Sequence, residues 1–316
     1  MTRVIAVLLL AVPGLVLPGL APPQSALAAD KPPWEIKPAA NIFGAKRPSF
    51  SYALPRGGQL RDGLLIVNRG RTPLTVSLHG ADAFTADDGS IELRSAEARP
   101  RDVGAWIQLD ETTVRVPPGR SVDVPFRLAL PDSAAPGDHL GGIVALVQQA
   151  GTTDRLTTTK IRLQVSGELK PALAVEDLKV QYSGTPNPFG EGSVAVTYTV
   201  RNTGNTIVAA RQAAAVTGPF GVFTAGAGQL ADSPQLLPGE SWKVAASISG
   251  VPPALRLTGT VSVVPVAKPA PQPTTAATAH VLTIPWTLLL LLIGCASVLT
   301  LAILSRRNRK RPAHAR

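Results

Sequence analysis

Residues 194–200 read VAVTYTV, and residues 201–206, directly behind them, read RNTGNT. The first stretch alternates apolar with small or polar residues, which is the period of two of a half-buried strand. The second stretch is an Asn-x-Gly turn, whose Asn and Gly tolerate positive φ. A strand of this kind with a turn directly behind it indicates a β-rich chain.

The same turn occurs once more, earlier in the chain. Residues 67–72 read VNRGRT, and a second pair of related turns follows, PGRS at 118–121 and PGES at 238–241. Strand, Asn-x-Gly turn, strand, then Pro-Gly turn and strand is a pattern typical of immunoglobulin-like sandwiches. The sequence therefore predicts an all-β fold with two immunoglobulin-like β-sandwich domains, the first over residues 30–168 and the second over residues 171–264.

Composition agrees with this fold class. The 316 residues are enough for two ordinary domains. Charged residues make up 16% and aromatic residues 4%, while there are 28 Gly and 30 Pro, a mixture that suits short strands joined by tight loops. Arg outnumbers Lys by 22 to 9, and with the abundant Ala and Pro this is typical of a high-GC bacterium.

The N-terminus has the layout of a secretory signal peptide, which we place at residues 1–28. Arg3 supplies the basic start, and an apolar run follows. Ala26 and Ala28 have the spacing of small residues that signal peptidase requires, so cleavage is expected after Ala28 or one residue later. The sequence therefore predicts export across a membrane.

A second apolar segment lies near the C-terminus. Ile284–Leu304 carries no charge, and at about 1.5 Å per residue a helix of this length just crosses a hydrocarbon core of about 30 Å. Trp286 lies at its outer end, where an indole prefers the membrane interface. Arg306 and Arg307 begin a basic tail, residues 305–316, which should stay in the cytoplasm. We expect a single-pass anchor in membrane lipid, with the domains outside the cell.

Residues 265–283, between the second domain and this anchor, are rich in Pro, Ala and Thr. Such a segment buries too little apolar surface to fold. We therefore expect a stiff spacer.

The net charge of +10 is unevenly distributed. The tail after Leu304 holds six basic residues and no acid, and Arg3 adds one more. About +3 remains for the rest of the chain, which has no basic helix. The charge therefore reflects membrane topology, and no nucleic-acid partner is expected.

Few residues suggest chemistry. The single cysteine, Cys295, lies in the C-terminal apolar segment, so the domains have no disulfide and no Cys-ligated metal. Asp138 and His139 could form a catalytic or metal pair, or a turn that leads into a buried strand, and we favour the turn. No cluster of three or four zinc ligands and no Gly-x-Ser-x-Gly elbow is present. We predict no enzyme activity, no cofactor and no metal site.

Aromatic residues offer candidate binding positions. Trp34, Trp106 and Trp242 could stack on sugar rings, although Trp106 also fits a core position and Trp242 an exposed strand position. Phe84 lies in residues 81–112, a long insertion of the kind that often carries binding residues. These four, with Asp138 and His139, are the candidate binding residues.

Several motifs of the first domain occur in a familiar order. They are RPSFSY at 47–52, AFT at 83–85, DGSI at 88–91, VPPG at 116–119, VPF at 124–126 and PGDHLGGIV at 136–144. In this order the domain resembles the WxL-interacting protein family of Gram-positive bacteria. The resemblance implies a peptidoglycan-binding first domain, a second sandwich, one transmembrane helix and a basic tail.

The function implied by this resemblance is that of a membrane-anchored cell-surface binding protein. Its partner would be peptidoglycan or another wall polymer, or a secreted wall-associated protein. An alternative is an extracytoplasmic scaffold or chaperone that presents a sheet edge to a secreted partner. A wall-modifying hydrolase that uses Asp138 and His139 is the third hypothesis.

Overall fold

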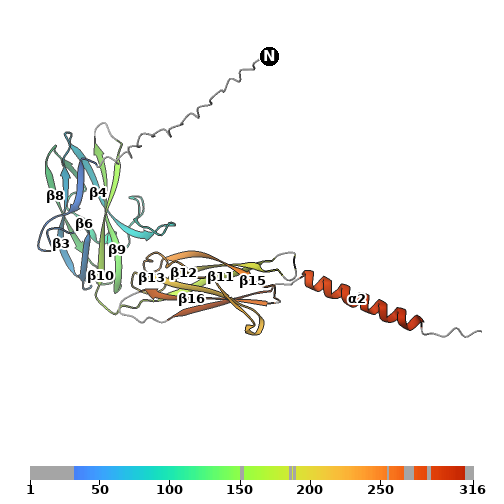
Figure 1. Ribbon diagram of the computed structural model, residues 1–316. Helices are drawn as coiled ribbons and strands as arrows, with labels where there is room; N and C mark the ends of the chain where they lie inside the picture. Colours follow the sequence, from blue (N-terminus) through green and yellow to red (C-terminus); the bar gives the residue numbers. More distant parts are fainter. Residues whose placement is uncertain are drawn as a thin grey trace, which may run out of the picture. The chain divides into compact units, whose positions relative to one another are not determined.

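Two β-sandwiches and one long C-terminal helix make up the described part of the protein (Figure 1). The computed structural model describes residues 32–149, 153–184, 187, 190–254, 256–266, 274–282 and 286–309. The predicted fold class, all-β with immunoglobulin-like sandwiches and one C-terminal apolar helix, is confirmed. The signal peptide with Ala26 and Ala28 lies outside the described residues, as does Ile284.

The first sandwich has two sheets. One has the strand order β1-β3-β8-β6, and the other β2-β10-β9-β4-β5, with β7 also on β4. The elements are β1 (Trp34–Pro38), β2 (Phe50–Leu54), β3 (Gln59–Asn68), β4 (Leu74–Thr85), β5 (Ile91–Leu93), α1 (Val103–Trp106), β6 (Ile107–Leu109), β7 (Thr113–Val116), β8 (Ser121–Ala129), β9 (Gly137–Gln149) and β10 (Arg155–Val165). Alternate residues of these strands face inward and fill one core, in which Phe50, Phe126 and Leu64 are fully buried.

The second sandwich is built in the same way. Its sheets have the orders β11-β12-β15 and β14-β13-β16-β17. The elements are β11 (Leu173–Ser183), β12 (Gly192–Asn202), β13 (Ala209–Thr217), η1 (Pro219–Gly221), β14 (Thr224–Gly226), β15 (Ser241–Val251), β16 (Arg256–Val266) and β17 (Thr275–Leu282). Val194, Val196, Tyr198 and Val200 of the alternating stretch are buried in its core.

The internal repeat corresponds to the same buried corner in each sandwich. Asn68 Nδ2 donates to the carbonyls of Thr72 and Val116 at 2.8 and 3.1 Å. Asn202 Nδ2 donates to Thr206 and Leu236 at 2.7 and 2.9 Å. Each Asn therefore ties its own turn to a neighbouring segment.

The backbone of these corners differs from the expectation. Gly70 and Gly204 do not have positive φ, because the Asn side chains close the turns by accepting from the glycine N–H groups. The Pro-Gly turns do need it, since Gly119 has φ 66° and Gly239 has φ 83°.

The expected spacer is partly wrong. Thr275–Leu282 forms β17, which pairs antiparallel with β16 and belongs to the second sandwich. Alternate residues of β17 are half-buried, and Ala279 and Val281 pack against the core. Small and β-branched residues on an alternating pattern fit a strand, and the Pro content of the whole segment hid that pattern.

The C-terminal helix α2 runs from Trp286 to Arg309. One stretch of it, Leu289–Arg306, is long and apolar enough to cross a membrane, with a mean hydropathy of 2.1 and none of it buried. The helix continues past the predicted end at Leu304, because helical hydrogen bonding does not stop at the last apolar residue. Single-pass membrane anchoring is therefore supported, and exposed Cys295 lies within the span.

Candidate functional site

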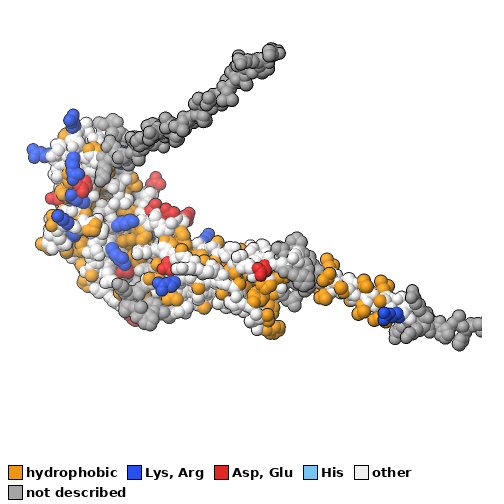
Figure 2. Space-filling model, viewed as in Figure 1, with side chains coloured by type: hydrophobic (Ala, Val, Ile, Leu, Met, Phe, Trp, Pro, Cys, Tyr) orange, Lys and Arg blue, Asp and Glu red, His pale blue; other side chains and the backbone are white. Residues whose placement is uncertain are grey.

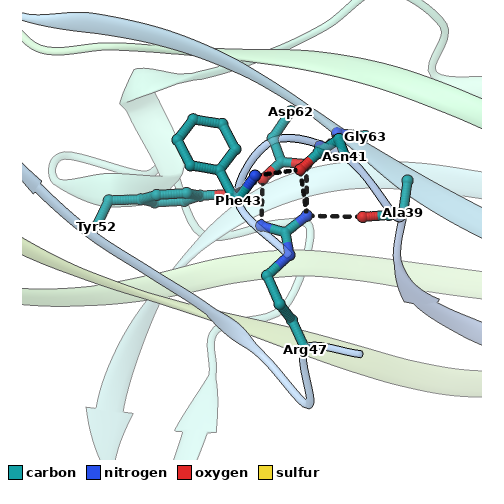
Figure 3. A network of polar contacts seen from close by, with 7 residues as sticks. All are labelled: Ala39, Asn41, Phe43, Arg47, Tyr52, Asp62 and Gly63. Atoms are coloured by element: carbon teal, nitrogen blue, oxygen red, sulfur yellow. Dashed lines mark hydrogen bonds and ion pairs between the residues drawn. The ribbon is translucent and has the colours of Figure 1, made fainter. Parts of the chain in front are cut away.

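A buried carboxylate organises one side of the first sandwich (Figure 3). The side chain of Asp62 on β3 has no solvent exposure. It accepts hydrogen bonds from Arg47 Nη1 and Nη2 at 2.5 and 2.9 Å, and from Asn41 Nδ2 and the Tyr52 hydroxyl, both at 2.5 Å. The Gly63 N–H donates a further bond at 2.6 Å. One carboxylate thus joins the connection between β1 and β2 to both β2 and β3.

The charges of this network stabilise one another. Burial alone would raise the pKa of Asp62, but the hydrogen bonds from Arg47 and Tyr52 outweigh it and hold that pKa below its usual value. Burial, together with Asp62, raises the pKa of the Tyr52 hydroxyl. Arg47 also donates to the Ala39 carbonyl at 2.8 Å. The network therefore fixes where the chain leaves one sheet and enters the other.

That crossing point determines how much of β10 is covered. The register pairs β2 in parallel with Ile161–Val165 only. Over Arg155–Lys160, β10 is hydrogen-bonded to β9 on its inner side, and no strand of the described residues pairs with its outer side. The outer edge of this sheet is therefore half covered and half open.

The backbone direction along the open edge follows from the covered half. Ser166 N–H donates outward to the Leu54 carbonyl at 2.9 Å. Alternate residues of a strand direct their backbone groups to the same side, and the pairing of β10 with β9 is unbroken. Leu156, Thr158 and Lys160 therefore direct their N–H and C=O groups to the open side.

The side chains of the open edge are suited to contact. Leu156, Thr158 and Lys160 are exposed, and Leu156 has 66% of its surface accessible. The intervening Thr159 is buried. An extended peptide bound here would meet a row of backbone groups beside one apolar and one cationic side chain.

His139 has both ring nitrogens engaged. Nδ1 lies 2.7 Å from Asp102 Oδ1, and Nε2 lies 2.9 Å from the Ala135 carbonyl. Burial lowers the pKa of His139, but the hydrogen bond and charge of Asp102 outweigh it, so this pKa lies above its usual value. A doubly donating imidazolium fits both contacts and leaves no free nitrogen to act as a base.

Asp138 is buried and links two parts of the chain. Its carboxylate accepts from the Ile207 N–H at 3.0 Å, and its own N–H donates to the Asn205 carbonyl at 2.8 Å. Asp138 and His139 line a cleft of about 740 Å³ with Asp102. Both residues have structural partners and belong to β9 itself, so the predicted turn ends before them.

The aromatic candidates are dispersed. Trp106 is buried in α1, with its ring centroid 5.1 Å from that of His139. Trp34 on β1 and Trp242 on β15 are half-buried, and each packs against the core of its own sandwich. Phe84 on β4 is half-buried, with the Arg94 guanidinium 5.0 Å from its ring centroid. These contacts do not bring the four rings together, and their role in binding stays a prediction.

The described anchor residues belong to α2, and their position in a membrane stays a prediction. Trp286 is the first residue of α2, Leu304 is exposed in its last third, and Arg306 and Arg307 are helical.

Asp62 escaped the sequence analysis although a signal was present. It occupies an inward position of the alternating stretch Leu60, Asp62, Leu64, Ile66. A carboxylate on a core face demands a buried partner, and Arg47 is that partner. The open half of β10 had no such signal, because strand pairing depends on tertiary structure.

No group of His, Cys, Asp and Glu in the described part of the chain could hold a metal ion. No family model matches the chain, and no curated protein does.

Solved structures with a similar arrangement include fimbrial chaperones. One match is to a chain of the chaperone–tip adhesin complex of CFA/I fimbriae. The match covers 80% of this protein and 99% of the matched chain, at 8% identity and a TM-score of 0.41. The match to the class 5 fimbriae chaperone CfaA covers 79% of this protein and 100% of CfaA, at 8% identity and a TM-score of 0.39. A third match is to a chain of the CsuC–CsuE chaperone–tip subunit complex from Csu pili of Acinetobacter baumannii. It covers 77% of this protein and 97% of the matched chain, at 10% identity and a TM-score of 0.36. All three TM-scores lie below 0.5, so this likeness carries no conclusion about the chain.

Proposed function

We propose that this chain is a membrane-anchored, extracytoplasmic binding protein without enzyme activity. It holds an extended segment of a secreted protein on the outer edge of β10. The single observation that carries this proposal is the uncovered edge at Arg155–Lys160, beside an edge that β2 already extends. The basic tail stays in the cytoplasm, and both sandwiches lie outside.

Strand addition supplies affinity through main-chain hydrogen bonds and specificity through alternate side chains. The open edge offers the outward backbone groups of three residues, Leu156, Thr158 and Lys160. The network around Asp62 keeps β2 from sliding over this edge, because it holds the chain before β2 in place. A rigid, half-open edge favours a protein partner.

Attachment to peptidoglycan is the second candidate, and it rests on the resemblance of the first domain to WxL-interacting proteins. It predicts retention of the purified domains by isolated cell walls. We treat this as the competing outcome of the experiment below.

The experiment places p-benzoylphenylalanine at position 156 of the full chain in the native cells and irradiates them. We expect an adduct with a secreted protein. A second substitution, Thr158→Pro, removes one outward N–H and no bond to β9, so it should abolish the adduct. Thr158→Val is the matched control, since it keeps the N–H and the β-branched shape, and it should leave the adduct intact.

The proposal fails if Thr158→Pro and Thr158→Val give equal adducts, because the contact would then not use the backbone edge. It also fails if the adduct contains glycan. Retention of the wild-type domains on purified cell walls would then favour attachment to peptidoglycan. A probe at Lys243, exposed on β15, reports non-specific adducts.

A further inference from the structure

The hairpin that joins β13 to β14 exposes large apolar side chains. Phe220 is fully exposed, and Val222 is 79% exposed. Phe220 also has φ 54°, a backbone conformation that a bulky residue seldom adopts. In Figure 2, hydrophobic side chains gather on the hairpin that projects from the second sandwich. Burial within the fold does not explain these two side chains.

Backbone hydrogen bonds and the packing of Phe223 fix the conformation of the hairpin. Gly218 N–H donates to the Phe223 carbonyl at 3.0 Å, and Val222 N–H donates to the Pro219 carbonyl at 3.2 Å. A Cβ added to Gly218 would lie 2.3 Å from the Phe223 ring, so only glycine allows that ring to fold back. Phe223 packs on the core, while Phe220 stands clear of it. The tip is therefore a defined loop that presents an aromatic ring to its surroundings.

Strand register places this tip at the end of the sandwich that leads into the membrane helix. Thr217 is opposite Thr258, and Thr258 is opposite His280 on β17. β13 and β17 run in the same direction, so the residues after Thr217 and after His280 extend toward the same end. Two strand spacings of about 4.8 Å separate them, or about 10 Å. Figure 1 shows this hairpin at the end of the sandwich where β17 finishes.

The distance from that end to the bilayer is short. From Leu282, the last residue of β17, to Trp286, the first residue of α2, there are four residue steps. Fully extended, they span at most about 14 Å. The headgroup layer on each side of a bilayer is about 5–7 Å thick. Leu282 is itself 78% exposed. The end that carries the tip is thus held within reach of the headgroups.

The charges at this end of the sandwich do not favour binding to a charged partner. Its described loops and strand ends carry one cation, Arg256, and one anion, Glu191, both exposed. A docking surface for a polyanion or for a basic protein would need an excess of one sign. Apolar contact with the acyl boundary needs no such excess.

We propose that Phe220 and Val222 insert into the interfacial layer of the bilayer and form a second membrane contact beside α2. The second sandwich then has two points of attachment, the helix and the hairpin tip. Two points restrict its tilt, whereas one point would leave it free to swing.

The test uses the full chain reconstituted at about one copy per vesicle in zwitterionic lipid. Cys295→Ser removes the native thiol, and Phe220→Cys carries an environment-sensitive fluorophore. The matched control is Lys243→Cys, exposed on β15 near the opposite end of the same sandwich. We expect severalfold weaker quenching by aqueous iodide at position 220 than at position 243, and quenching by spin-labelled lipid only at position 220.

Equal iodide quenching at the two positions would overturn the proposal. Protection from iodide without quenching by spin-labelled lipid would also overturn it, because the tip would then lie against protein. If quenching by spin-labelled lipid at position 220 occurred only in vesicles that contain anionic lipid, apolar insertion would be contradicted. Both labelled positions are exposed, so circular dichroism should show unchanged melting of the variants.

Discussion

Replacing Asp62 by Asn is the sharpest test of the network that fixes the β1–β2 crossing. The substitution keeps the shape of the side chain but removes its charge. Two of the five hydrogen bonds come from Arg47, and one oxygen of the carboxylate becomes an NH2 group that faces donors. Arg47, whose side chain is only 13% exposed, loses its counterion.

The magnitude follows from burial. Breaking a buried ion pair by removing one partner costs about 3–5 kcal/mol. We take the lower end, about 3 kcal/mol, because Arg47 retains some solvent and its bond to the Ala39 carbonyl. With a urea m-value of about 2 kcal/mol/M, the midpoint should fall by about 1.5 M.

The assay is urea unfolding of residues 32–282, with the transition of each sandwich fitted separately. Only the first sandwich should be destabilised. Glu35→Gln is the control, since it removes an exposed ion pair with Arg69 and should leave the midpoint unchanged. An unchanged midpoint for Asp62→Asn, or an equal shift in both sandwiches, would refute the reasoning.

The same carboxylate has a signature in pH. Its folded pKa is lowered, so its contribution is fully present above the unfolded value of about 3.9 and is lost as pH falls through the folded value. The wild type should therefore lose stability in this acid window more steeply than Asp62→Asn.

Three further predictions concern other residues. Asn202→Ala should lower the stability of the second sandwich by about 2 kcal/mol, measured by thermal melting, because it leaves buried carbonyls without donors; a change within error would contradict this. His139 has a raised folded pKa, so its contribution should be full below about pH 6.5 and fade as pH rises through the raised value. His139→Gln should flatten that pH profile in urea unfolding, and an unaltered profile would count against the pairing with Asp102. Thr158→Pro should leave the melting temperature nearly unchanged, whereas Thr159→Pro, whose N–H faces β9, should cost about 3 kcal/mol or more; equal losses would show that the strand direction is misassigned.

Much of the fold was predictable because local chemistry expressed it. The Asn-x-Gly repeat marked the same corner in both sandwiches. The positive φ expected there is found instead at Gly119 and Gly239 of the Pro-Gly turns. The sequence did not indicate why these turns need Asn. The side chains of Asn68 and Asn202 donate hydrogen bonds to segments 48 and 34 residues away. Such partners are invisible to a local reading of the turn.

The site was less predictable than the fold. Asp138 and His139 stood out as titratable neighbours, yet their partners Asp102 and Ile207 come from distant segments. The open edge of β10 depends on where β2 begins and ends, which the crossing from β1 sets. Composition also misled at β17, because Pro and Thr around a strand resemble a linker until a neighbouring strand offers a ladder.

The position of β17 has a consequence for the order of events during synthesis. It is the last strand of the second sandwich to leave the ribosome, and α2 begins four residues after it ends. The first sandwich can close while the chain is still growing. The second lacks an edge strand until α2 is about to emerge, so its sheet is completed only shortly before the helix itself is synthesised.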